Sequence, residues 1–166
     1  EGLLLLTNDG ELARLLELPS TAWIRRYRVR VYGRPQLSNL EKLSNGVTLD
    51  GIKYGAIDIK LDKQGPSNAW LTIGLREGKN REVRRLMESI ELKVMRLIRI
   101  SFGPFQLGNL EVSGIEEVKQ YSLKEQLGVP AIKAENFGRA APKKRTYHKI
   151  RDKKRNADRS RSQSRR

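Results

Sequence analysis

The sequence contains no cysteine and a single histidine, His148. Disulfides and cysteine-based metal sites are therefore excluded, and neither a histidine-dependent catalytic triad nor a histidine-rich metal site is expected. Apolar runs of about 18 residues, which a membrane-spanning helix needs, are absent, and so is a signal-peptide pattern. We therefore expect a cytoplasmic protein that carries no metal and is not embedded in a membrane.

Positive charge is abundant but unevenly distributed. The 166 residues carry a formal net charge of +15. Residues 1–132 hold 20 Lys/Arg against 16 Asp/Glu, whereas residues 133–166 hold 14 against 3. This charge distribution predicts a domain at 1–130 followed by a basic, disordered tail at 131–166 that binds a polyanion, with nucleic acid as the first candidate. An anionic membrane surface is the second candidate, although the tail has no apolar face to insert.

Strands and short helices alternate along the predicted domain. Leu3–Thr7 is a continuous apolar run that predicts a buried strand, and Asp9 is a suitable N-cap for a helix over 11–18. Further strands are predicted at 23–32, 47–49, 52–54, 56–61, 69–75 and 93–102, and further helices at 36–44, 81–90 and 115–127. This arrangement favours an α+β fold built around a largely antiparallel sheet with short flanking helices.

The strand predicted at 23–32 has two chemically different faces. Tyr27, Val29 and Val31 alternate with three arginines, namely Arg26, Arg28 and Arg30. Since neighbouring side chains of a strand point to opposite faces, one face is expected to be covered and the other charged. Taken alone, a tyrosine in this position is more often a core aromatic residue than a catalytic one.

The helix predicted at 81–90 begins in the densest cluster of positive charge. Asn80 is its predicted N-cap, and its apolar face is made by Val83, Leu86, Met87 and Ile90. Arg84 borders that face, so its guanidinium should be half-buried and should need a carboxylate or phosphate partner. A helix N-terminus favours phosphate, but a solvated charged surface would give the same sequence.

Four motifs in order resemble those of the bacterial ribosomal-RNA pseudouridine synthases of the RsuA/RluB type. Glu1–Gly10 resembles the second half of G-R-L-D-x-x-[ST]-x-G-L-L-L-L-T-[NT]-D-G, and Arg26–Val29 resembles [KR]-x-Y-x-V. Gly78–Leu86 resembles G-x-[NH]-x-[QE]-[VI]-[RK]-R-[ML], with Glu82 where the family usually has glutamine. Arg96–Leu110 resembles the closing strand and glycine turn.

The resemblance implies a pseudouridine-synthase fold and an isomerase that needs no cofactor and acts as a monomer on ribosomal RNA, with the large subunit as the more probable source. In this family the catalytic aspartate lies about four residues before the position of Glu1, and a small S4-type RNA-binding domain precedes it. The sequence is therefore expected to be truncated at its N-terminus. As given, the chain is expected to be inactive, because it lacks that aspartate.

The resemblance also assigns roles to individual residues. Tyr27 would stack on the target base, and Arg84 would pair with the catalytic aspartate and keep it ionised. Leu97 would pack under the base, although a plain core leucine fits the sequence equally well. The side chains expected to contact RNA are Arg26, Arg28, Arg30, Lys79, Asn80, Arg81, Arg85 and Arg96.

Two other functions fit the same charge distribution. A noncatalytic basic protein could bind ribosomal RNA through these surfaces, and it would show a steep dependence on salt without any isomerisation. A ribosome-associated or membrane-surface protein could instead depend on its tail, in which case deletion of residues 133–166 would abolish binding.

Overall fold

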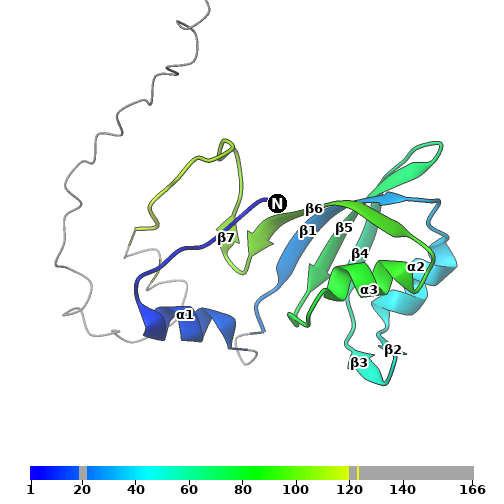
Figure 1. Cartoon of the computed structure of the whole chain (residues 1–166), viewed down its shortest axis with the longest axis horizontal. Helices are drawn as coiled ribbons and strands as arrows, with labels where there is room; N and C mark the ends of the chain where they lie inside the picture. The colour runs from blue at the N-terminus through cyan, green and yellow to red at the C-terminus, as the bar shows by residue number, and fades with distance from the viewer. Residues whose placement is uncertain (19–21, 120–122, 124–166) are drawn as a thin grey trace, which may run out of the picture. The chain divides into compact units, whose positions relative to one another are not determined.

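In the computed structural model, five strands pair into one antiparallel sheet in the order β4-β5-β1-β6-β7 (Figure 1). The strands of this sheet are β1 (Arg25–Tyr32), β4 (Asp58–Gln64), β5 (Asn68–Leu75), β6 (Lys93–Phe102) and β7 (Phe105–Gln106). A small hairpin is formed by β2 (Val47–Leu49) and β3 (Ile52–Tyr54), and the helices are α1 (Gly10–Glu17), α2 (Leu37–Ser44) and α3 (Glu82–Glu88). The predicted α+β class is confirmed.

The structure describes residues 1–18, 22–119 and 123. The chain divides into two units, and all of the elements named above lie in the first, Glu1–Val118. The basic tail predicted at 131–166 lies outside the described residues. Within the described part of the chain, no helix is long and apolar enough to cross a membrane.

The alternation predicted for β1 is present. Arg26, Arg28 and Arg30 are exposed, Val29 and Val31 are fully buried, and Tyr27 is partly buried. β1 lies between β5 and β6 in the sheet, so its covered face is at the centre of the fold. This face, which we call the Tyr27 face, is distinguished below from the opposite side of the sheet, the far face.

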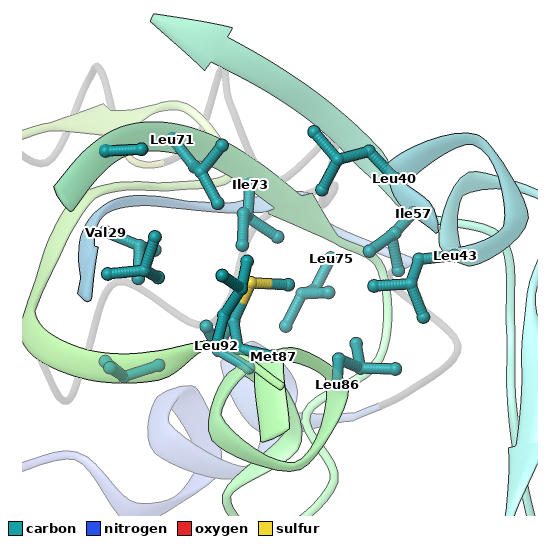
Figure 2. Close-up of a cluster of buried hydrophobic side chains, with 14 of the residues drawn as sticks. Val29, Leu40, Leu43, Ile57, Leu71, Ile73, Leu75, Leu86, Met87 and Leu92 are labelled. Atoms are coloured by element: carbon teal, nitrogen blue, oxygen red, sulfur yellow. The ribbon is translucent and has the colours of Figure 1, made fainter. Parts of the chain in front are cut away.

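Two short helices cover the Tyr27 face. Leu86 and Met87 of α3 and Leu40 and Leu43 of α2 surround the buried β5 side chains, as Figure 2 shows around Ile73. Burial of such side chains stabilises the fold by roughly 1.5–3 kcal/mol each. Because α3 contributes to this core, its position relative to the sheet is fixed by packing.

The buried strand predicted at Leu3–Thr7 is wrong. Leu4 and Leu6 are 70% and 81% exposed, and among the described residues this segment pairs only through a parallel bridge between Gly2 and Arg99. The backbone N–H of Leu3 donates to the Arg99 carbonyl at 2.8 Å, and the chain then leaves the edge of β6. The apolar composition was therefore a poor guide, because a strand also needs a partner along its length.

The helix that follows this segment agrees with its prediction. Asp9 caps α1, with its carboxylate accepting from the backbone N–H groups of Glu11 and Leu12 at 2.9 and 3.1 Å. Capping of this kind contributes about 1 kcal/mol.

The last predicted helix does not begin where expected. Residues 115–119 are not helical, and Ile115 is 91% exposed. The chain turns at Ser113, which has a positive φ, and residues 114–119 are all exposed, so they have no buried face to stabilise a helix. The rest of that prediction, residues 120–127, lies outside the described residues apart from the helical Leu123.

Candidate active site and RNA-binding surfaces

Tyr27 and Leu97 lie on the same face of adjacent strands. Tyr27 stands opposite Ile73 of β5 and Arg99 of β6, and Leu97 stands opposite Val29. Both side chains are partly exposed and pack against the buried core. Each therefore presents apolar surface to solvent at the margin of the core, as a site that stacks a base requires.

The arrangement of β6 depends on two irregularities in its pairing with β1. The register shifts between Arg30 and Val31 and between Arg26 and Tyr27, so that Met95 and Ile100 are left without a partner residue. Each extra residue is a β-bulge, which lets the strand keep its side chains facing the core despite uneven spacing. Leu97 and Arg99 share the Tyr27 face by regular alternation, and the two bulges bring Val94 and Phe102 to the same face.

Arg84 is half-buried, as its position on α3 predicted. Its Nη1 donates to the backbone carbonyl of Val94 at 3.2 Å, which ties the side chain to β6. No carboxylate among the described residues pairs with Arg84. A guanidinium carries several N–H donors, so Arg84 keeps donors free for an anionic partner.

The start of α3 differs from the prediction, because Asn80 does not cap the helix. Arg81 is the N-cap residue and has a left-handed backbone with φ of 51°. The Glu82 carboxylate instead turns back and accepts the backbone N–H of Lys79 at 3.0 Å. Glu82 is 4% exposed, and this burial raises the pKa of its carboxyl group. The periodicity of the sequence did not indicate the left-handed turn at Arg81, and the predicted N-cap was therefore misplaced by one residue.

Lys79 is already paired in the structure. It forms an ion pair with Glu77 and lies 5.6 Å from the centre of the Tyr54 ring. The hydrogen bond from Lys79 lowers the pKa of Glu77 and raises that of Lys79. Arg81 and Arg85, by contrast, are exposed near the start of the same helix.

The strand arginines point away from Tyr27. Arg26, Arg28 and Arg30 lie on the far face, where the Arg28 guanidinium sits 4.9 Å from the centre of the Trp70 ring. Arg96 stands opposite Arg30 and is bound to the Glu1 carboxylate, with Nη2 to Oε2 at 2.8 Å. The hydrogen bond from Arg96 lowers the pKa of Glu1.

The residues predicted to bind RNA therefore fall into two groups. The far-face group is Arg26, Arg28, Arg30 and Arg96, and the helix group is Lys79, Asn80, Arg81 and Arg85. The helix group borders α3 and is on the side of the sheet that carries Tyr27, whereas the far-face group is not brought together with Tyr27.

Two arginines that sequence reasoning missed do lie on the Tyr27 face. The Cζ atoms of Arg25 and Arg99 are 4.9 and 5.3 Å from the centre of the Phe102 ring. The alternation of β1 already placed Arg25 on the same face as Tyr27. The bulge at Ile100 hid the position of Arg99, because strict alternation does not put Arg99 and Phe102 on one face.

Comparison with curated proteins gives relatives with a consistent name. The chain is 44% identical over 127 residues to an uncharacterized RNA pseudouridine synthase of Rickettsia prowazekii, which covers 76% of this chain and 54% of the relative. It is 42% identical over 136 residues to the ribosomal large subunit pseudouridine synthase B of Haemophilus influenzae, which covers 78% of this chain and 38% of the relative. No family model matches.

A solved structure described as a pseudouridylate synthase has the same fold. It superimposes with a TM-score of 0.61 at 19% identity, covering 73% of this chain and 52% of that structure. The chain thus spans about half the length of the Rickettsia relative and of the solved structure it matches. Together, the relatives and the shared fold confirm the resemblance to the RNA pseudouridine synthases of the RsuA/RluB type that the four sequence motifs indicated.

Proposed function

We propose that this chain forms the base-binding part of a ribosomal-RNA pseudouridine synthase that isomerises a specific uridine of large-subunit RNA. Identity of 44% to a protein named RNA pseudouridine synthase, over 76% of the chain, supports this function. The observation that carries it is structural. Tyr27, Leu97 and the helix that bears Arg84 meet on one face of the sheet, although they come from three distant segments.

The reaction exchanges one bond of the nucleoside for another. The bond between N1 of uracil and C1′ of ribose breaks, the base turns, and C5 bonds to C1′ while the C5 proton is lost and N1 gains one. The uridine must first leave its stack, at a cost of a few kcal/mol. Stacking on the Tyr27 ring and apolar contact with Leu97 would offset this cost.

Arg84 would pair with the catalytic aspartate of the family. An adjacent guanidinium stabilises the ionised carboxylate and lowers its pKa. The family places this aspartate about four residues before the position of Glu1, whose carbonyl accepts the Arg99 backbone N–H at 2.9 Å. Four extended residues reach at most about 14 Å. The aspartate would therefore lie near β6, the strand to which Arg84 is bonded.

The helix group and the far-face group would hold the RNA backbone. Contacts between arginine or lysine and phosphate supply affinity that is largely independent of sequence and falls with salt. Because Lys79 and Arg96 are already in ion pairs, binding phosphate through them would require exchange of Glu77 and Glu1 for the RNA. We propose that the protein acts as a monomer in the cytoplasm.

Isomerisation of ribosomal RNA tests this function directly. The protein is expressed from its native reading frame and incubated with unmodified ribosomal RNA, and the nucleosides are then digested and separated by chromatography. Tyr27→Phe and Arg84→Ala are expected to lose activity while remaining folded. For Arg84 the loss should be about 10–100-fold, the value of a hydrogen bond to a charged group.

Glu88→Ala is the matched control, because Glu88 is an exposed residue of the same helix. Its activity should stay within about twofold of the unchanged protein, as for most exposed positions. Pseudouridine formation that is unaffected in Tyr27→Phe and Arg84→Ala would contradict the proposal. Tight, salt-sensitive binding without any pseudouridine would favour the noncatalytic RNA-binding protein.

A further inference from the structure

We propose that Arg25 and Arg99 form a phosphate clamp that holds the RNA backbone of the nucleotide whose base rests on Tyr27. This inference depends on the proposed function, because it names the part of the substrate that these two side chains recognise.

The Phe102 ring gives the two guanidiniums a common support. Arg25 and Arg99 lie with their Cζ atoms 4.9 and 5.3 Å from its centre. Phe102 is 7% exposed, and Trp23 contacts it edge-on with ring centres 5.9 Å apart. A fixed ring that attracts two cations positions both guanidiniums beside it despite their mutual repulsion. Such a pair of like charges is stabilised when an anion binds between them.

The hydrogen bonds of these arginines leave donors available. Arg25 Nη1 donates to the carbonyls of Arg76 and Trp23 at 3.1 and 3.4 Å, and Arg99 Nε donates to the carbonyl of Leu3 at 2.8 Å. These carbonyls orient the guanidiniums without neutralising them. Among the described residues, neither arginine forms an ion pair.

Glu82 is the acidic group that interacts electrostatically with Arg25. Its carboxylate is held by the Lys79 backbone N–H, and among the described residues it forms no ion pair with Arg25. Both arginines remain partly exposed. An anion from solvent can therefore reach them, and a planar guanidinium matches phosphate geometry better than an ammonium does.

The position of the pair indicates which phosphate it would bind. Arg99 stands directly opposite Tyr27 across the β1–β6 pairing, and Arg25 lies two residues before Tyr27 on the same face. Two residues of a strand span about 6.6 Å. A base stacked on Tyr27 would therefore carry its own phosphate, or the neighbouring one, to the two guanidiniums.

Salt dependence of RNA binding tests the clamp. The full chain is titrated with a short single-stranded oligouridylate at several salt concentrations. Arg25→Gln and Arg99→Gln should each weaken binding about 10-fold and lower the slope of log affinity against log salt by about 0.7, the value for one lost phosphate contact on a single strand. Arg34→Gln is the control, since Arg34 also donates to a carbonyl, that of Pro66 at 3.0 Å, and lies beyond the other end of β1.

A double-mutant cycle with Tyr27→Ala adds a test of location. If the clamp and Tyr27 hold the same nucleotide, the losses of Arg25→Gln and Tyr27→Ala should be non-additive, whereas those of Arg34→Gln and Tyr27→Ala should add. Circular dichroism of every variant verifies the fold. If Arg99→Gln is unfolded for want of the bond to Leu3, Arg99→Lys replaces it, with a smaller loss expected because the charge is kept.

The outcomes separate the two proposals. If the unchanged chain does not bind oligouridylate, this result contradicts both the proposed function and the clamp. If the chain binds but Arg25→Gln and Arg99→Gln show the slope of Arg34→Gln, the clamp alone is wrong. Loss of slope in both variants, with coupling to Tyr27, supports it.

Discussion

At the scale of single residues, Gly103 shows how tightly the support of the arginine pair is built. Gly103 has a φ of +52°, and a Cβ there would lie 2.7 Å from Cδ2 of Trp23. Trp23 in turn contacts Phe102, the ring on which Arg25 and Arg99 rest. A side chain at this glycine would therefore disturb backbone and ring together.

Gly103→Ala should lower the free energy of unfolding by about 1–3 kcal/mol, because alanine strains a left-handed backbone and collides with Trp23. Gly10→Ala is the matched control. No described atom lies within 4 Å of the Cβ it would add, and Gly10 is the first residue of α1. It should be neutral or stabilising by up to about 1 kcal/mol. Urea denaturation measures both, and equal midpoints would contradict this account.

At the scale of elements, α3 depends on a side chain that the sequence did not single out as a cap. Glu82 binds the Lys79 backbone N–H, whereas Asn80 is exposed and forms no cap. Glu82→Ala should therefore destabilise the protein by about 1 kcal/mol through the lost cap, and Asn80→Ala should have little effect. Thermal unfolding of the two variants distinguishes them. A larger loss for Asn80→Ala would show that the sequence-based assignment was right.

The pH dependence of Glu82→Gln follows from the direction of the Glu82 pKa shift. Burial raises the pKa of Glu82 in the folded state above its ordinary value of 4.5. The favourable contribution of the protonated form is then complete below pH 4.5 and is lost as pH rises through the raised pKa. Glutamine stays neutral, so its gain in stability over glutamate should be larger at pH 7 than at pH 4. Urea midpoints measured at both pH values check this, and a constant difference would contradict it.

Comparison of β1 with β6 shows what the sequence could predict. In β1 the strict alternation of arginine with Tyr27, Val29 and Val31 was sufficient to assign both faces. The ends of β6 were predicted correctly as Lys93 and Phe102, but the sequence alone does not assign its faces, because bulges arise from pairing with another strand. The same limitation explains why the strand predicted at Leu3–Thr7 is wrong, because this apolar run has no partner strand along its length among the described residues.

The sequence also indicated some residues of the candidate site and missed others. Half-burial of Arg84 followed from its angle around the helix, and the resemblance singled out Tyr27 and Leu97. Arg25 and Arg99 were missed, since their shared support by Phe102 is a contact between neighbouring strands. The assigned roles of Tyr27, Leu97 and Arg84 stay predictions that the isomerisation assay tests.

At the scale of the whole molecule, most of the excess positive charge lies in a different part of the sequence from the residues that would bind the base. Residues 133–166 carry 14 Lys/Arg and 3 Asp/Glu, whereas Tyr27 and Leu97, which would bind the base, belong to the sheet. A segment with such an excess of positive charge strengthens RNA binding in a salt-dependent way without selecting a base.

Deletion of residues 133–166 should therefore weaken binding to ribosomal RNA by at least about 10-fold at salt concentrations between 50 and 200 mM. It should also reduce the slope of log affinity against log salt concentration. The protein expressed from its native reading frame without these residues should still bind RNA, and it should form pseudouridine at the same position when RNA is in excess. Filter binding and nucleoside chromatography measure the two effects. Complete loss of binding would favour a protein that depends on its tail.

The two bulges of β6 bear on how much the length of this strand can change. Val94, Leu97, Arg99 and Phe102 lie on the Tyr27 face of β6. Leu97 and Arg99 are two residues apart, as regular alternation requires. Each of the other two steps is three residues long and contains one bulged residue, Met95 or Ile100. Loss of Met95 would make the pairing regular and leave every later side chain on its present side. Loss of Ile98, where pairing is regular, would reverse the sides of the residues beyond it. Deletion in β6 should therefore be tolerated at the bulged residues Met95 and Ile100, and not at the regularly paired positions between them.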